Sequence, residues 1–392
     1  MTIEEATKPP KRQLWELQSM QAAPLSVKIA LTKDRIREWV NQYGEDGVYV
    51  SFSGVKDSTV LLTIAREMYP DIKAVFVDTG LEYPEIRDFV RTWDNVEWLK
   101  PKLTFKQVIE KYGYPFIGKE VAQIIYECKV AINNGKQPPL YRMQKLNGEA
   151  IDKKTGEKST YNIPQYKYLL EAPFAISHMC CKVMKKSPAH DYFKETGRKP
   201  ILGQMAIESR LRRQHWLKYG CNGFDLKLPT SNPLAFWTEQ DVLQYAKTRN
   251  VTLASVYGDI VNEDEDGMTY DSMFCEMPLK TTGCQRSGCM FCGFGCHLEK
   301  PGEGRFERMK LTHPKQYAYL FGDGKWIFEI RNANGSKINV KRVPYSTMMK
   351  WAEQNKDNPN FVISKRYVPD KGLGYQEVID WLNEHGNLDI RY

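Results

Sequence analysis

The sequence predicts an α/β fold built on a mostly parallel sheet with flanking helices, followed by a smaller C-terminal α+β part. Three short apolar or β-branched runs, at residues 48–52, 72–77 and 96–99, have the length and composition of strands. Apolar residues recur at helical spacing after the first run, and a helical stretch over residues 83–93 follows the second. Strands that alternate with helices in this way form parallel sheets.

Length and composition indicate a globular protein. The 392 residues are 42% hydrophobic, which is enough for one large core or two, since domains usually run to roughly 100–200 residues. No apolar run approaches the ~20 residues that span a bilayer, and residues 1–11 lack a signal-peptide core, so we expect a cytoplasmic protein with no membrane contact. The net charge of +8 is compatible with a nucleotide or nucleic-acid partner but does not require one.

Composition also suggests how the chain is divided. Residues 1–24 are polar and proline-bearing, so we expect a loosely packed N-terminal arm. Residues 25–300 would hold the α/β domain, which opens with a helix over residues 25–43. Within it, residues 133–165 become polar and lose apolar periodicity, which predicts an insertion or mobile loop, either a lid or a plain surface excursion.

The remaining residues, 301–392, would form the C-terminal extension. Runs at 326–331 and 337–343 flank Asn334-Gly335, a strong hairpin signal, and residues 375–382 predict a helix. The hairpin mixes basic and aromatic residues, a combination that can stack on and neutralise a nucleic acid; a solvated hairpin face is the alternative. These residues are Lys325, Trp326, Phe328, Arg331, Lys337, Lys341 and Arg342.

Residues 53–58, Ser-Gly-Val-Lys-Asp-Ser, are the main candidate site. They lie between the first strand and the helix after it, so they form a helix N-terminus. Free backbone N–H groups and the positive end of the helix dipole favour an anion there, and Ser53, Lys56 and Ser58 add donors. We therefore predict a nucleotide-phosphate cradle, with an ordinary capped turn as the alternative. It is not a Walker A loop, because no Gly-Lys-Ser or Gly-Lys-Thr closes it.

A second turn, Asp78-Thr79-Gly80, ends the second strand. Ligands of parallel sheets bind beyond the carboxyl ends of the strands, so this turn and residues 53–58 would face one pocket. Taken alone, it would be a routine strand-ending turn.

Four segments carry a family resemblance. Residues 53–58 resemble the Ser-Gly-Gly-x-Asp-Ser signature of the ATP pyrophosphatases, or PP-loop family, with Val55 at the second glycine. Residues 78–85 resemble the Asp-Thr-Gly-x-x-(Phe/Tyr)-Pro-Glu segment of the phosphoadenosine phosphosulfate (PAPS) reductase family, a branch of the same superfamily. Residues 203–212 resemble its Gly-x-Arg-x-x-Glu-Ser-x-x-Arg element, with Met205 at the first arginine. Residues 233–242 resemble its Pro-(Leu/Ile)-x-x-Trp-Thr-x-x-Asp-Val stretch, where Thr238 and Asp241 predict a helix-capping box.

The resemblance implies a doubly wound sheet of the adenine nucleotide alpha hydrolase type and an adenylyl-nucleotide site. Arg210, Arg212 and Arg213 would meet the anionic part of the nucleotide, because guanidinium forks bond phosphate or sulfate bidentately; a solvated basic helix face is the alternative. Asp57, Lys56, Arg210 and Arg213 would act in catalysis, with Mg²⁺ near Asp57. ATP, or PAPS or adenylylsulfate, would be bound by Ser51, Ser53, Gly54, Val55, Lys56, Asp57, Ser58, Asp78, Thr79, Gly80, Gly203 and Glu208.

Nine cysteines are an odd number for a disulfide framework, so metal ligands, redox thiols or buried hydrophobes are expected. Cys289-x-x-Cys292 can place two thiolates on one metal or cluster face. A structural Zn²⁺ could use Cys284, Cys289, Cys292 and either Cys296 or His297. A [4Fe-4S] cluster could use the same four cysteines or recruit Cys180 and Cys181. A metal-free set of buried cysteines is the remaining alternative.

The adjacent pair Cys180-Cys181, about a hundred residues before Cys289-x-x-Cys292, resembles the [4Fe-4S] site of adenylylsulfate reductases. This resemblance implies those four ligands, with Cys284 and Cys296 as further candidates.

Three functions follow from the resemblance. Asp57 after Lys56 resembles the ATP-cleaving branch, which implies cleavage of ATP to AMP and pyrophosphate and activation of an acceptor, a nucleic acid, for transfer of sulfur from a sulfur donor. The second is reduction of PAPS or adenylylsulfate to sulfite with a thioredoxin-like reductant. The usual reductases carry a C-terminal Glu-Cys-Gly-(Leu/Ile)-His tail, and here no cysteine follows Cys296. The third is a non-catalytic nucleotide-binding module, suggested by Val55 and Met205.

Overall fold

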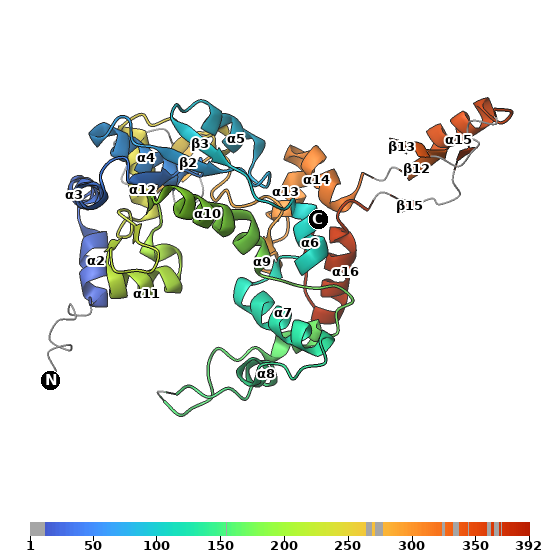
Figure 1. Cartoon of the computed structure of the whole chain (residues 1–392), viewed down its shortest axis with the longest axis horizontal. Coiled ribbons are helices and arrows are strands. Elements are labelled where there is room, and N and C mark those ends of the chain that lie inside the picture. Colours follow the sequence, from blue (N-terminus) through green and yellow to red (C-terminus); the bar gives the residue numbers. More distant parts are fainter. Residues whose placement is uncertain are drawn as a thin grey trace. The chain divides into compact units, whose positions relative to one another are not determined.

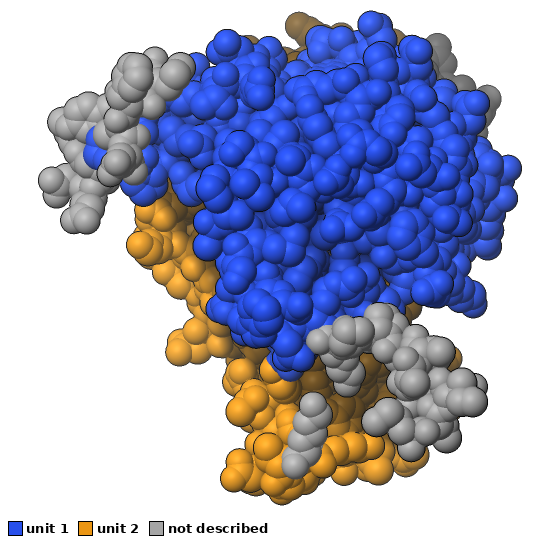
Figure 2. Space-filling model, turned by 90° about the vertical axis from the view of Figure 1, so that its left-hand side faces the viewer, with its two compact units in different colours: residues 1–105, 181–289 blue, residues 106–180, 290–392 orange. Residues whose placement is uncertain are grey.

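The computed structural model describes residues 12–153, 155–263, 269–270, 277–323, 326–331, 337–343, 345–358, 362–363, 368–369 and 371–392. The chain divides into two compact units (Figure 2). Unit 1 comprises Met1–Phe105 and Cys181–Cys289, and unit 2 comprises Lys106–Cys180 and Met290–Tyr392. Each unit is therefore made of two separate stretches of chain. The domain boundaries expected at residues 24 and 300 stay predictions.

Unit 1 is organised around a six-stranded sheet with the order β3-β2-β1-β5-β7-β6. Figure 1 labels two of its strands, β2 and β3. The first five of these strands run parallel, and only β6 pairs antiparallel, with β7. The predicted mostly parallel sheet is thus confirmed. The strands are β1 (Val48–Ser51), β2 (Ala74–Val77), β3 (Val96–Leu99), β5 (Lys199–Leu202), β6 (Asn222–Gly223) and β7 (Thr230–Ser231).

Helices cover both faces of this sheet. Successive side chains of β1 point to opposite faces, so each face presents side chains that a helix can bury. Val48 and Val50 join the main core with Trp39 of α3, whereas Tyr49 packs with Tyr192 of α10 on the other face. The sheet is therefore doubly wound, as predicted. The longer helices of unit 1 are α2 (Leu14–Ala22), α3 (Leu25–Tyr43), α4 (Lys56–Met68), α5 (Pro84–Arg91), α10 (Ser187–Thr196), α11 (Arg210–Tyr219) and α12 (Glu239–Thr248).

Shorter elements complete unit 1. A three-stranded antiparallel sheet with the order β10-β8-β9 follows α12 in the chain. Its strands are β8 (Ile260–Glu263), β9 (Thr269–Tyr270) and β10 (Leu279–Thr281), and the short helices are η2 (Lys182–Lys186), η3 (Ala206–Glu208) and η4 (Ser255–Tyr257).

Helix α2 corrects the prediction of a loosely packed arm. Leu17 is 1% exposed and belongs to the main core of unit 1. This burial could not be predicted from an apolar stripe, because Leu17 is the only buried residue of α2.

Unit 2 is mainly helical and has an aromatic core. The Tyr375 ring lies 5.1 Å from Phe116, 5.8 Å from Phe306 and 5.9 Å from Phe321, measured between centroids. Two short strands, β4 (Phe116–Ile117) and β11 (Gly293–Phe294), pair in parallel within it. The remaining helices are α6 (Phe105–Tyr112), α7 (Lys119–Asn133), α8 (Leu140–Asn147), η1 (Pro164–Leu170), α9 (Met179–Cys181), η5 (Cys296–Leu298), α13 (Arg305–Thr312), α14 (Pro314–Phe321), α15 (Tyr345–Gln354) and α16 (Tyr375–Gly386).

The predicted C-terminal hairpin is confirmed as β12 (Trp326–Arg331) paired antiparallel with β13 (Lys337–Val343). Strands β14 (Val362–Ile363) and β15 (Val368–Pro369) also pair with β12. The Asn334-Gly335 turn, and the side chains of the predicted basic and aromatic surface, lie outside the described residues.

The predicted insertion contains helix α8, in which Leu146 is fully buried, so residues 140–147 are not a loop. No helix in the described part of the chain is long and apolar enough to cross a membrane.

Candidate functional site

The predicted cradle lies between β1, which ends at Ser51, and α4, which begins at Lys56. Gly54 in this turn has a φ of +71°, a conformation that favours glycine. A Cβ atom on Gly54 would lie 2.6 Å from Val90 Cγ2 and 2.8 Å from Ile86 Cγ2, so helix α5 passes too close for any side chain. The turn thus requires glycine for two independent reasons.

The cradle is closed by its own serines. Ser58 Oγ donates to the Val55 carbonyl at 2.9 Å and accepts from the Ser53 N–H at 3.2 Å. Ser53 Oγ lies 3.1 Å from Ser58 Oγ. Gly203, which directly follows β5, lies so close to the start of α4 that a Cβ atom on it would be 3.2 Å from the Asp57 carbonyl oxygen.

Asp57 occupies the first turn of α4 and has an unsatisfied carboxylate oxygen. Its Oδ1 is buried and has no hydrogen-bond partner within the described residues. Burial raises the pKa of Asp57, and Lys56, Arg212 and Arg286 oppose this effect. Since buried polar atoms are nearly always hydrogen-bonded, this oxygen marks a place where a ligand is expected.

Lys56 is fixed by contacts within unit 1. Its ammonium donates to the Gln285 carbonyl at 2.8 Å and lies 3.0 Å from Glu239 Oε1. It also lies 5.7 Å from the centroid of the Tyr257 ring. Only 7% of the side chain is exposed. The predicted phosphate contact of this ammonium would therefore compete with three protein contacts.

Tyr257 ties a distant segment to the cradle. Its hydroxyl accepts from the Lys56 N–H at 3.3 Å and hydrogen-bonds to Ser287 Oγ. Burial raises the pKa of Tyr257 far above its ordinary value, so it stays a phenol. Residues 285–287 lie between two predicted metal ligands, Cys284 and Cys289. The contacts of Gln285 and Ser287 show that this segment lies against the predicted cradle.

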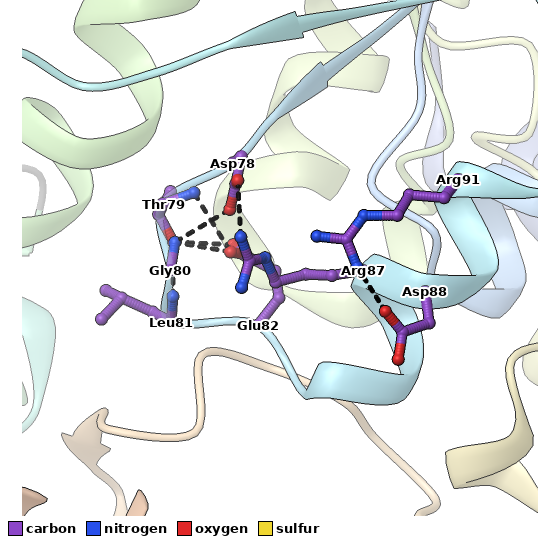
Figure 3. A network of polar contacts seen from close by, with 8 residues as sticks. All are labelled: Asp78, Thr79, Gly80, Leu81, Glu82, Arg87, Asp88 and Arg91. Atoms are coloured by element: carbon purple, nitrogen blue, oxygen red, sulfur yellow. Dashed lines mark hydrogen bonds and ion pairs between the residues drawn. The ribbon is translucent and has the colours of Figure 1, made fainter.

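The turn after β2 forms a closed polar network (Figure 3). Asp78 accepts from the Gly80 N–H at 3.2 Å and pairs with Arg87 at 2.9 Å. Glu82, which is 8% exposed, accepts from the Thr79 N–H at 3.1 Å and from the Thr79 hydroxyl at 2.8 Å. The sequence predicted Asp78, Thr79 and Gly80 here but missed the buried carboxylate of Glu82, although it lies in the quoted segment.

The arginine element separates into two groups. Arg212 pairs with Glu208. Burial lowers the pKa of Arg212, and the negative charge of Asp57 opposes this effect, so the guanidinium interacts electrostatically with the cradle. Arg210 and Arg213 instead line a hollow of about 150 Å³ between α2 and the start of α11. Met205 is 4% exposed within the core, so no cation stands at the first arginine position of the family element.

The predicted metal ligands are divided between the two units. Cys181, Cys284 and Cys289 belong to unit 1, and Cys180, Cys292 and Cys296 belong to unit 2. Among the residues that the structure describes, no group of three or more His, Cys, Asp or Glu side chains could hold a metal ion. Cys275 lies outside those residues.

The cysteines nevertheless differ in their surroundings. Burial lowers the pKa of Lys185, but the nearby Cys289, Glu82 and Cys181 raise it by more, so the net shift is upward. A charged ammonium group therefore lies near two cysteine sulfurs. Burial raises the pKa of Cys296 to about 12, which keeps that thiol protonated. Cys284 donates to the Arg286 carbonyl at 3.0 Å.

Comparison with known proteins identifies the family. The model of the phosphoadenosine phosphosulfate reductase domain matches residues 47–126 and 140–293, which is more than half of the chain. The chain belongs to the PAPS reductase family. The match includes the cradle, the Asp78 turn, the arginine element and most of the cysteine segment. Members of this family are enzymes that act on adenine nucleotides, and the nucleotide-binding role of residues 53–58 stays a prediction.

Individual relatives are more distant. An uncharacterized protein of Methanocaldococcus jannaschii is 38% identical over 73 residues, which cover 17% of this chain and 18% of that protein. An adenosine 5'-phosphosulfate reductase of Staphylococcus epidermidis is 30% identical over 101 residues, or 24% of this chain and 42% of the reductase. The chain thus spans less than half the length of these curated relatives. A PAPS reductase of Candida auris, solved with phosphate, covers 57% of this chain and 82% of its own at 14% identity, with a TM-score of 0.32.

Proposed function

We propose that this PAPS reductase family member cleaves ATP to AMP and pyrophosphate and thereby activates an acceptor, a nucleic acid, for sulfur transfer in the cytoplasm. One observation carries the proposal: at the N-terminus of α4, Asp57 has a buried carboxylate oxygen that lacks a hydrogen-bond partner among the residues that the structure describes. A carboxylate there would repel a bare phosphate, but it suits a nucleotide that arrives with a divalent cation.

The residues present fit Mg²⁺ in this role. Magnesium prefers oxygen ligands and is usually bound through one or two carboxylates together with substrate phosphates. Asp57 would hold it through its carboxylate, whose Oδ1 has no partner in the described part of the chain. When bound, the ion would neutralise phosphate charge. Ser53, Ser58 and backbone N–H groups in the first turn of α4 would bind the phosphates themselves.

The reaction is a substitution at the α-phosphorus. An acceptor oxygen forms a new bond to this phosphorus, the bond from the α-phosphorus to the bridging oxygen of the β-phosphate breaks, and pyrophosphate leaves with that oxygen. The acceptor loses its proton and becomes adenylylated. Arg212 and Arg286, which both lower the pKa of Asp57, would stabilise the negative charge that builds up on the phosphates.

A [4Fe-4S] cluster and a sulfur donor remain part of the proposal only as predictions from the cysteine pattern. Thiolates suit iron and zinc, but the described cysteines do not gather into a ligand set, so we derive no step through a cluster.

Release of pyrophosphate tests the proposal. The purified chain would be given ATP, Mg²⁺ and single-stranded or transfer RNA, and pyrophosphate would be measured. We expect release that depends on the nucleic acid and is abolished in Asp57→Asn. Asp88→Asn is the matched control, since Asp88 is an exposed aspartate of α5 that pairs with Arg91 at the surface. A protein that releases no pyrophosphate with any nucleic acid would refute the proposal.

Reduction of PAPS or adenylylsulfate to sulfite is the second candidate, and the similarity to the Staphylococcus epidermidis reductase favours it. Sulfite release with a thioredoxin-like donor, without pyrophosphate from ATP, would identify that activity. Tight nucleotide binding without any turnover, unchanged in Asp57→Ala, would instead identify a non-catalytic binding module.

A further inference from the structure

A hollow of about 150 Å³ lies in unit 1 between α2 and the start of α11. It opens to solvent, because Leu14 and Ile207, which line it, are 44% and 59% exposed. None of the cradle residues 53–58 lines it. The hollow is therefore distinct from the predicted nucleotide cradle.

The wall of the hollow is rich in hydrogen-bond donors. Arg210 and Arg213 contribute guanidinium groups, which only donate and keep their positive charge. Gln18, Gln21 and Ser209 add amide and hydroxyl groups that can also donate. None of the described residues that line the hollow is acidic. Two positive charges on this wall exclude a cation and favour an anion over a neutral ligand.

Size and geometry favour a phosphate group as this anion. The hollow has the volume of about five water molecules at ~30 Å³ each, well below the roughly 300 Å³ at which pockets for larger ligands begin. One phosphate group fits, whereas a whole nucleotide does not. Guanidinium forks bond phosphate oxygens bidentately. Arg210 and Arg213 are three positions apart in α11 and line the same hollow, so both can bond one group.

The surface beside the hollow offers a place for a base. Trp15 of α2 is 63% exposed, although tryptophan is highly buried on average. It lies three positions before Gln18, so the two side chains are neighbours on the helix surface. Proteins bind single strands of nucleic acid by neutralising the phosphates and stacking the bases on aromatic rings. A free phosphate ion would leave the Trp15 ring without a partner.

We propose that this hollow holds a backbone phosphate of a single-stranded nucleic acid, with a nearby base stacked on Trp15. Arg210 and Arg213 bond the phosphate, and the amides of Gln18 and Gln21 add neutral donors. In this way α2 and α11 would hold the backbone of the acceptor on unit 1. That role rests on the proposed function, whereas the binding of nucleic acid at the hollow does not.

Equilibrium binding of a single-stranded RNA of about 12 nucleotides to the full chain, measured by fluorescence anisotropy without ATP, tests the site. Arg210→Gln combined with Arg213→Gln should weaken binding by about tenfold or more, because charged hydrogen bonds are lost. The slope of log affinity against log salt should flatten by about 0.7, the value for one phosphate contact to a single strand. Arg37→Gln with Arg91→Gln is the matched control, since it removes the same charge from two exposed arginines that pair with aspartates.

The base contact has its own variants. Trp15→Ala should weaken RNA binding by about fivefold or more, whereas Trp15→Phe, which keeps an aromatic ring, should retain most of it. A phosphorylated peptide of equal net charge should bind about tenfold more weakly than the RNA, and this comparison needs no variant to fold. Equal affinity for the peptide, or RNA binding that is unchanged in the arginine double variant or in Trp15→Ala, would overturn the proposal.

Saturating ATP with Mg²⁺ separates the hollow from the cradle. RNA binding that persists beside bound ATP supports the proposal, because different residues line the two sites. Mutual exclusion would overturn it, since the two arginines would then hold phosphates of the cradle nucleotide. Arginine-dependent RNA binding without pyrophosphate release would refute only the proposed function. Pyrophosphate release with the same dependence on RNA concentration in the wild type and the arginine double variant would refute only this site.

Discussion

Replacing Gly54 by alanine is expected to destabilise unit 1 through two separable effects. Gly54 has a φ of +71°, and a left-handed conformation costs an L-residue about 1–2 kcal/mol. The new Cβ would also lie 2.6 Å from Val90 Cγ2 and 2.8 Å from Ile86 Cγ2. Val90 and Ile86 are 0% and 1% exposed, and their branched side chains are stiff at χ1, so neither can turn away. Overpacking of this kind costs about 1–3 kcal/mol, which makes the total about 2–5 kcal/mol.

Gly80→Ala is the matched control. Gly80 has a φ of +72°, almost the same as Gly54, but nothing lies within 4 Å of a Cβ placed there. Only the conformational cost of about 1–2 kcal/mol should appear. Urea unfolding followed by tryptophan fluorescence would measure both variants, and hydrogen exchange of peptides from β1 and α4 would locate the loss. Equal destabilisation of the two variants would show that the close approach of α5 to the cradle does not exist in solution.

Three further outcomes are expected. Asp57→Asn should abolish pyrophosphate release yet stabilise the fold at neutral pH. Burial raises the folded-state pKa of Asp57, so the wild type loses stability as the pH rises through that pKa. The asparagine amide does not ionise, so urea unfolding at a series of pH values should show no such loss in the variant. Asp241→Ala should cost about 3–5 kcal/mol in unfolding experiments, because it leaves Lys28 buried without its 2.7 Å partner; exposed Asp34, paired with Arg37, should cost less than about 1 kcal/mol when replaced by alanine. Iron, zinc and sulfide analysis of anaerobically purified protein should find iron and acid-labile sulfide, with a broad visible absorption that bleaches on reduction, whereas a colourless zinc protein would refute the iron-sulfur prediction.

Local patterns were enough to predict the sheet and the cradle. The expected strand at residues 96–99 and the expected helix at residues 25–43 match β3 and α3 in both bounds, and α4 begins inside the predicted turn. These elements have strong apolar periodicity, which depends only on neighbours in the sequence. The capping box of Thr238 and Asp241 is also confirmed, since the Thr238 N–H donates to Asp241 at 2.6 Å.

The residues that the prediction missed are linked to the cradle only through the tertiary fold. Lys56 contacts Gln285 and Glu239, and Tyr257 contacts the Lys56 backbone, all across about 180 to 230 positions. No short-range pattern encodes such contacts. The glycines and cysteines around residue 286 predicted a metal site, so Arg286 was assigned no role in the nucleotide site.

One feature of the arginine element was within reach of the sequence. Residues three apart on a helix share a face, so Arg210 and Arg213 should lie together, with Arg212 turned elsewhere. The structure has this arrangement, because Arg210 and Arg213 line the hollow beside α2 and Arg212 acts on Asp57. Helical geometry therefore separates Arg212 from the two arginines that we assigned to catalysis, and that assignment stays a prediction.

The interleaving of the two units sets an order on folding during synthesis. The ribosome makes β1, the cradle and α4 early, but their neighbour β5 and the residues around Tyr257 and Arg286 emerge only after residues 106–180 of unit 2 have been made. At ~5–20 residues per second, the first three strands wait several seconds or more with one edge of β1 unpaired. Unit 2 waits longer, because Tyr375 at the centre of its aromatic core follows both stretches of unit 1 in the chain. A nascent chain of this design exposes one edge of β1 until β5 at residues 199–202 is made, so its yield in cells should depend on chaperones more than its final stability would suggest.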